Sequence, residues 1–156
     1  MEWLSDEQQR IWRNYLAMTG SLQTAMHRQL QQDCELSLSD YDVLVALSER
    51  GPMRINELGD LIGWEQSRVS HQLRRMRGRG LLHREGHDED RRGATVSITD
   101  EGRSALETAA PGHVELVRTA VFDGLSDAQL RAFGSAIETV LARIKPGKPA
   151  SQSSTD

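Results

Sequence analysis

The chain has 156 residues, of which 37% are hydrophobic and 27% charged, and its formal net charge is −4. This length fits one domain, or a small domain with helical extensions, and it is enough to bury a core. No apolar run approaches the roughly 18 residues that would indicate a membrane span, and the stretch MEWLSDEQQR lacks the apolar region of a signal peptide. We therefore expect a cytoplasmic protein with no membrane partner. The single cysteine excludes an internal disulfide.

Positive charge is concentrated in one segment. Residues 66–84 contain six arginines and no Asp or Glu, so this segment carries +6 while the remainder of the chain sums to −10. Such asymmetry predicts a surface that binds a polyanion, because phosphate contacts need clustered arginines rather than a basic average. A GC-rich genome could also explain seventeen Arg against two Lys, so the positions of the arginines matter more than their number.

The first half of the chain is predicted to be helical. Apolar side chains at steps of three and four predict a long amphipathic helix over 5–32. A second helix, capped by Ser39, should end at Gly51, and a short third helix should cover 55–62. Gly63 should then interrupt the chain before a fourth helix begins two or three residues later.

After the fourth helix the apolar period changes to that of strands. Residues 81–85 and 94–98 are short apolar or alternating stretches on either side of the polar tip GHDEDRRG, which predicts a hairpin. Thr99 is a suitable cap for a fifth helix, which should run to about Phe122 and could bend at Pro111.

The sixth helix has the clearest start. Ser126 and Gln129 have the spacing of a capping box, in which each side chain bonds the backbone N–H of the other residue. The apolar stripe that follows ends before Pro146. The stretch 146–156 is rich in Pro, Ser and Lys without large apolar side chains, and we expect it to be a disordered tail.

The fourth helix divides into two faces. Val69, Leu73 and Met76 are separated by four and three residues, so they share one side of the helix and should face the core. The opposite face is polar and basic. It carries Ser67, His71, Arg74 and Arg75, with Arg68 and Arg77 on its flanks. A helix fits the major groove of B-form DNA, where Arg can donate two hydrogen bonds to guanine. The alternative is a solvated cationic face.

The neighbouring elements favour DNA. A short helix, a tight turn at Gly63 and then this basic helix have the order of a helix-turn-helix. The hairpin places Arg91 and Arg92 at its tip, where a basic finger could enter the minor groove beside the helix. Two adjacent basic elements of different shape are harder to explain as solvated surface. Together they predict a winged helix-turn-helix in a mainly α chain with a small β wing.

The wing sequence resembles that of a known family. The run DRRGATVSITDEG is similar to the wing signature of MarR-type transcriptional regulators, and INELGDLIGWEQSRVSHQLRRMRGRGLLHR is similar to their helix-turn-helix. The signature positions here are Asp90, Arg92, Val96, Ile98, Thr99 and Gly102. The resemblance implies that Arg92 inserts into the minor groove of DNA and that Asp90 orients the wing. It implies that the major groove is faced by Ser67, Arg68, Ser70, His71, Arg74 and Arg75. With Arg77 and Arg91 added, these residues form the predicted DNA-binding set.

The resemblance also implies an obligate homodimer. The chain would be a single unit over 1–145, with the winged helix-turn-helix at about 38–99 and dimerisation helices at about 5–32 and 100–145. The two recognition helices would then lie roughly 34 to 36 Å apart, which is one turn of DNA, so the target should be a pseudo-palindrome.

A small-molecule effector is a further expectation from the resemblance. Relatives bind small aromatic or phenolic acids between the dimerisation helices and the winged domain. The residues that could line such a cleft here are Tyr15, Met18, Met26 and Trp64. Packing in the core or in an interface is the alternative role for each of them.

Other kinds of site have weaker support. Cys34 could sense oxidants, with Tyr41 as a neighbour, but it follows the first helix, whereas the sensor of redox-responsive relatives is near the start of that helix. Four possible metal ligands lack close helical spacing, namely His27, Cys34, Glu35 and His113. We expect no metal site, no cofactor and no catalytic motif. We therefore do not expect an enzyme.

The sequence therefore predicts a homodimeric repressor that a small ligand releases from its operator. An effector-independent architectural DNA binder is one alternative, and a redox- or metal-responsive regulator is another. A third is a module whose arginines bind an acidic protein.

His71 is a departure from the resemblance, since many relatives have Arg or another long polar side chain at its position. Unlike Arg, a histidine can gain or lose its charge near neutral pH. Protonation of His71 would add positive charge to the DNA-facing side of the helix. We expect the operator to bind more tightly at about pH 6 than at about pH 8. Binding titrations of the chain and of His71→Ala measure the difference, and an identical pH response in both proteins would contradict it.

Overall fold

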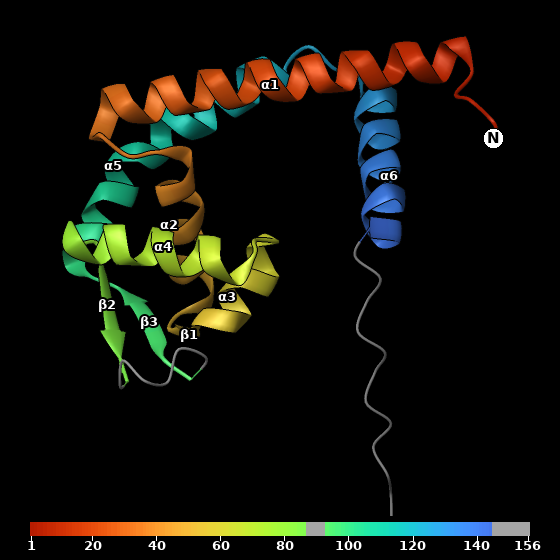
Figure 1. Ribbon diagram of the computed structural model, residues 1–156. Helices are drawn as coiled ribbons and strands as arrows, with labels where there is room; N and C mark the ends of the chain where they lie inside the picture. The colour runs from red at the N-terminus through yellow and green to blue at the C-terminus, as the bar shows by residue number, and fades with distance from the viewer. Residues whose placement is uncertain (87–92, 145–156) are drawn as a thin grey trace, which may run out of the picture. The chain divides into compact units, whose positions relative to one another are not determined.

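The structure of the chain is a computed structural model, and it describes residues 1–86 and 93–144 (Figure 1). Its contacts divide the chain into two compact units, Met1–Leu116 and Val117–Asp156. The elements of the first unit are α1 (Asp6–Cys34), α2 (Leu38–Arg50), β1 (Met53–Arg54), α3 (Ile55–Ile62), α4 (Gln66–Gly78), β2 (Leu82–Glu85), β3 (Thr95–Ile98) and most of α5 (Asp100–Val117). The second unit contains the π-helical turn η1 (Arg118–Phe122) and α6 (Asp127–Ile144).

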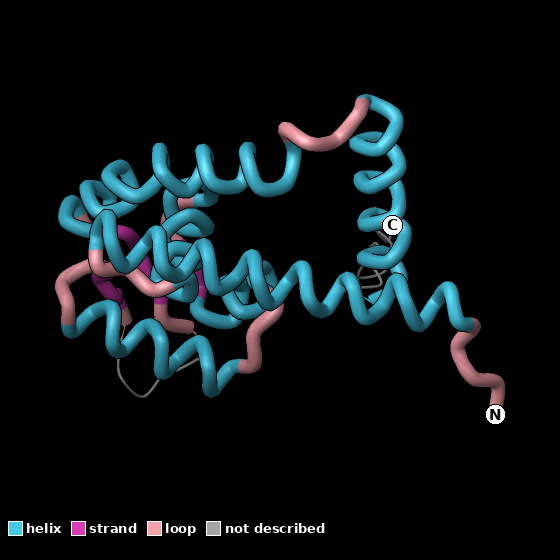
Figure 2. Tube along the Cα trace, turned by 90° about the horizontal axis from the view of Figure 1, so that it is seen from above, coloured by secondary structure: helices cyan, strands magenta, loops and turns pink. Residues whose placement is uncertain are grey.

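The predicted fold class, mainly helical with a small β wing, is confirmed. The order of helices and the hairpin is the predicted one, and helices dominate the tube in Figure 2. None of the helices in the described ranges is long and apolar enough to cross a membrane. The predicted tail, 146–156, lies outside the described residues.

Serine side chains set the starts of α1, α2 and α6. Ser126 and Gln129 form the predicted capping box, with N–O distances of 3.0 and 3.2 Å. The prediction for α2 was wrong, because Ser37 rather than Ser39 caps that helix in a box with Asp40. Both serines have an Asp three residues later, so local spacing does not distinguish them. Contacts of Asp40 with α4, described below, favour the earlier start.

The sheet in the described part of the chain has the strand order β1-β3-β2, and its pairs are antiparallel. The β2–β3 hairpin was predicted, and its register pairs Leu82 with Ile98. The short strand β1 was not predicted, because two residues are too few to show a period of two. It pairs Met53 with Val96 and joins the start of α3 to the wing.

The core of the first unit lies between α2, α3, α4 and the sheet. Its largest fully buried side chains are Leu30, Leu36, Leu44, Leu47, Leu58, Met76, Val43, Val69 and Val96. Burial of each such Leu contributes about 1.5–3 kcal/mol relative to exposure. Leu30 of α1 and Ala109 of α5 belong to the same cluster, so both long helices pack against the winged domain.

Thr99 connects the end of the wing to α5. Its hydroxyl donates a hydrogen bond of 2.6 Å to the backbone oxygen of Gly80 and accepts one of 3.0 Å from the backbone N–H of Gly102. The predicted cap is therefore confirmed. Gly102 packs so closely on the α4–β2 connection that a Cβ there would lie 2.3 Å from the backbone oxygen of Leu81. Thr99 and Gly102, two positions of the wing signature, therefore stabilise the junction between the wing and α5.

Gly102→Ala should consequently destabilise the chain. The added methyl would also lie 2.9 Å from Cγ1 of Ile98. The backbone of Leu81 would have to shift to make room for it, which would disturb the hydrogen bonds around it. Overpacking of this kind costs about 1–3 kcal/mol. Thermal unfolding should show a clear fall in melting temperature. Gly78→Ala is the matched control, because a Cβ at Gly78 meets nothing within 4 Å in the described structure. Equal melting temperatures for the two variants would refute the close-packing argument.

Candidate nucleic-acid interface

The turn between α3 and α4 places α4 across the end of α3. Gly63 ends α3 in the left-handed region with φ 73°, and its backbone N–H bonds the oxygen of Gly59 at 2.9 Å. Glycine adopts this conformation without the steric cost that a Cβ brings. Together α3, this turn and α4 form a helix-turn-helix, and the β2–β3 hairpin follows it as a wing (Figure 1).

The two faces of α4 are those predicted. Val69, Leu73 and Met76 are 0%, 3% and 0% exposed and belong to the core. On the other side, the exposed members of the predicted set are Ser67, Arg68, His71, Arg74 and Arg75. Ser70 and Arg77 are half-buried. A row of exposed donors and positive charge therefore stands on a helix whose opposite side is fixed in the core.

Arg68 is held by an aromatic neighbour. Its guanidinium lies over the Trp64 ring, 4.1 Å from the ring centroid, which is a cation–π contact. Trp64 itself is half-buried and packs on the core beside α4. Arg68 also influences Asp42 of α2. Loss of water raises the pKa of the Asp42 carboxyl, and the positive charge of Arg68 opposes that rise.

A buried polar contact on α4 was missed by the sequence analysis. Gln72 is 3% exposed, and its side-chain nitrogen donates a hydrogen bond of 2.6 Å to Oδ1 of Asp40. Arg79 donates to Oδ2 of the same carboxylate at 2.7 Å. Arg79 therefore differs from the arginines on the outer face of α4, because its guanidinium is engaged by the buried carboxylate of Asp40 although the side chain itself is exposed.

The wing is described at its base and not at its tip. The strands β2 and β3 and the residues Thr99 and Gly102 are placed as described above. The predicted DNA contacts Asp90, Arg91 and Arg92 lie outside the described residues.

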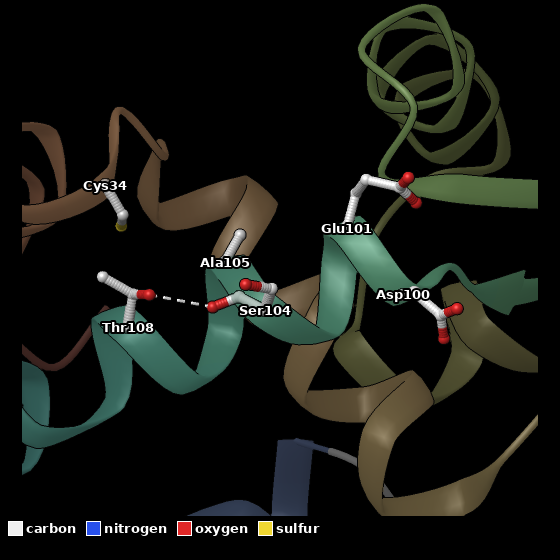
Figure 3. Close-up of a pocket in the computed structure, with 6 residues that line it drawn as sticks. All are labelled: Cys34, Asp100, Glu101, Ser104, Ala105 and Thr108. Atoms are coloured by element: carbon white, nitrogen blue, oxygen red, sulfur yellow. Dashed lines mark hydrogen bonds between the residues drawn. The ribbon is translucent and has the colours of Figure 1, made fainter.

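The predicted ligand-lining residues lie in different elements. Tyr15 and Met18 are exposed on α1, and the Tyr15 ring stacks on Trp12 with centroids 5.4 Å apart. Met26 is half-buried on the same helix, whereas Trp64 contacts Arg68 in the helix-turn-helix. None of the four lines the 560 Å³ pocket beside the start of α5 (Figure 3). That pocket is lined by Cys34, Asp100, Glu101, Ser104, Ala105 and Thr108.

Cys34 lies at one end of this pocket and the acidic pair Asp100 and Glu101 at the other (Figure 3). The thiol donates a hydrogen bond of 3.2 Å to the backbone oxygen of Leu30. Burial raises the pKa of the Cys34 thiol above its ordinary value, with a smaller rise from the negative charge of Asp33. An unreactive, protonated thiol is the state that this environment favours at neutral pH.

The other possible metal ligands do not gather around Cys34. His113 of α5 instead packs against the buried ring of Tyr41, with ring centroids 4.3 Å apart. Burial lowers the pKa of the His113 imidazole and raises that of the Tyr41 hydroxyl. Across residues 1–86 and 93–144, no three His, Cys, Asp or Glu side chains stand close enough to hold a metal ion.

A helix-turn-helix with a basic second helix and an adjoining wing defines a DNA-binding transcriptional regulator. Comparison with known proteins agrees with this class. The model of the MarR family matches residues 36–93. Sco3205, a MarR family transcriptional regulator from Streptomyces coelicolor crystallised in complex with DNA, is 36% identical with a TM-score of 0.87, over 94% of this chain and 93% of that one.

Two further relatives extend the likeness. AbsC, a MarR family transcriptional regulator from the same organism, is 32% identical with a TM-score of 0.86, over 94% of this chain and all of that one. YfiV of Bacillus subtilis, an HTH-type transcriptional regulator, is 25% identical over 134 residues, which are 79% of this chain and 83% of YfiV. The chain belongs to the MarR family. This is a family of transcriptional regulators rather than of enzymes.

Cys34 provides a prediction that separates a plain thiol from a sensor. Because its pKa is raised, less thiolate is present at neutral pH, and alkylation by iodoacetamide should be several-fold slower than in the urea-unfolded chain. The midpoint of the pH–rate profile should lie higher for the folded chain. A midpoint at or below that of the unfolded chain would show an activated thiol and would favour redox sensing.

Proposed function

We propose that this MarR-family regulator is a homodimeric repressor, which binds a pseudo-palindromic operator and leaves it when a small ligand binds. The observation that carries the proposal is the exposed basic face of α4, which is supported from behind by buried Val69, Leu73 and Met76. A rigid helix with this face has the width and the donors that the major groove requires.

Within this proposal the DNA-binding residues divide by position. Side chains in the first half of a recognition helix contact base edges, which on α4 are Ser67, Arg68, Ser70 and His71. The later residues Arg74, Arg75 and Arg77 add donors and charge for bases or phosphates. The wing residues Asp90, Arg91 and Arg92 are proposed from the sequence resemblance alone.

The homodimer is supported by apolar side chains that remain exposed in the single chain. On α1 these are Ile11, Trp12, Tyr15, Leu16 and Met18. On α6 they are Leu130, Ile137, Val140, Leu141 and Ile144. Large exposed apolar patches on a protein of this size usually mark an interaction surface. We assign the helices at about 5–32 and 100–145 to the dimer interface.

The ligand is proposed to be a small molecule, with aromatic and phenolic acids as the class that the sequence resemblance implies. Trp12 and Tyr15 offer stacked aromatic rings, and Met18 and Met26 are adaptable apolar neighbours on the same helix. A ligand can release the operator only through different affinities for the DNA-competent and DNA-incompetent dimers. It would act by changing the separation of the two recognition helices.

The test is selection of bound duplexes from a random DNA pool with the purified chain. We expect a pseudo-palindrome whose half-sites are centred about one DNA turn apart. Arg74→Gln should weaken binding to the selected duplex and lower its salt slope by about one unit. Arg50→Gln replaces an exposed arginine of α2, outside both the proposed DNA-binding set and the dimerisation helices, and should leave the affinity and the salt slope unchanged. A pool without enrichment, or equal losses in both variants, would contradict the proposal.

A further inference from the structure

The basic face of α4 is connected to the interior by a continuous series of hydrogen bonds. It begins at the backbone oxygen of Glu35, which accepts from Arg79, and passes through Asp40 and Gln72 to the exposed guanidinium of Arg75. We propose that Asp40 and Gln72 are positioning residues that fix the direction of Arg75 toward DNA. The inference rests on the proposed function of α4 as the recognition helix.

Asp40 is the branching point of the series. It is 4% exposed, and its Oδ2 accepts from the backbone N–H of Ser37 at 2.9 Å and from Arg79 at 2.7 Å. Its Oδ1 accepts from the side-chain nitrogen of Gln72 at 2.6 Å. The carboxylate therefore has donors before the start of α2, within α4 and just beyond the end of α4, and it cannot rotate without losing them.

The carboxylate determines which way the Gln72 amide points. An ionised carboxylate only accepts hydrogen bonds, so the NH₂ group of Gln72 must face Asp40. The amide oxygen of Gln72 is then directed outward, where Nη2 of Arg75 donates to it at 2.5 Å. Gln72 and Arg75 are three residues apart, which places them side by side on the helix surface.

This contact matters for recognition because Arg75 has a long, flexible side chain. Fixing its rotamer before DNA arrives reduces the conformational entropy lost on binding. It also directs the planar guanidinium, whose bidentate hydrogen bonds to guanine or phosphate depend on orientation. A leucine at position 72 could fill the same space, but it would offer Arg75 no acceptor.

The proposal predicts a specific effect of Asp40→Asn. The oxygen of the new amide would stay with the donors Arg79 and Ser37, so its NH₂ group would face Gln72. The Gln72 amide would have to turn over and present its own NH₂ group to Arg75. Two donors would then oppose each other, and Arg75 would lose its fixed direction.

A second substitution should restore the order of hydrogen-bond donors and acceptors between position 40 and Arg75. In Asp40→Asn with Gln72→Glu, the new carboxylate can accept from the amide at position 40 and from Arg75 together. The formal charge of the pair is unchanged, and only the donor and acceptor roles are exchanged. A role confined to general stability would not predict this rescue of DNA binding.

The experiment measures affinity for the duplex that the chain selects from the random pool, with thermal unfolding followed in parallel. We expect Asp40→Asn to weaken binding about ten-fold, as for loss of one oriented arginine contact, and the double variant to recover most of that loss. In an Arg75→Ala background, Asp40→Asn should have little further effect. Arg74→Ala is the control background, because it leaves the hydrogen-bonded series intact. In that background Asp40→Asn should weaken binding as much as it does in the unsubstituted chain.

Gln72→Leu provides a second route if Asp40→Asn does not fold, and it should give the same dependence on Arg75. Equal losses in the Arg75→Ala and Arg74→Ala backgrounds would overturn the inference, and so would wild-type affinity for folded Asp40→Asn or Gln72→Leu. These outcomes leave the proposed function standing. Failure of the unsubstituted chain to enrich any duplex would instead overturn the proposed function.

Discussion

The carboxylate of Asp40 accepts hydrogen bonds from the start of α2, from the middle of α4 and from Arg79 just beyond its end. An isolated buried charge would cost several kcal/mol, and these donors offset that cost only while all of them keep their places. Arg79 also bonds the backbone oxygen of Glu35, the residue that follows α1. The end of α1, the start of α2 and the end of α4 are therefore linked through the Asp40–Arg79 pair.

Apolar packing and this polar anchor support α4 in different ways. Val69, Leu73 and Met76 bury one side of the helix, and the hydrophobic effect that favours this burial has no direction of its own. The hydrogen bond from Gln72 to Asp40 is directional and adds an orientation-dependent contact to this packing. On the outer side, Arg68 rests on Trp64 and Arg75 bonds Gln72, so two arginines of the basic face are held before any ligand arrives. Base readout demands such orientation, whereas phosphate contacts tolerate movement.

Local patterns in the sequence predicted those parts of the structure that local physics decides. The capping box of Ser126, the faces of α4 and the β2–β3 hairpin all depend on residues close in the chain. Ser37 was missed because Ser39 has the same spacing to an Asp, and only contacts with α4 distinguish them. Asp40 and Gln72 are 32 residues apart, and neither shows an unusual local pattern. Trp64, predicted to line a ligand cleft, lies beneath Arg68; it precedes α4, so the helical period of α4 does not indicate this pairing.

We propose that the basic face of α4 meets the major groove of DNA, with polar contacts distant in the sequence directing its side chains. The most direct measurement is a structure of the chain bound to the duplex that it selects. We expect α4 in the major groove, with Arg75 contacting DNA while it keeps its hydrogen bond to Gln72. A complex in which α4 faces solvent and another surface contacts the DNA would contradict it.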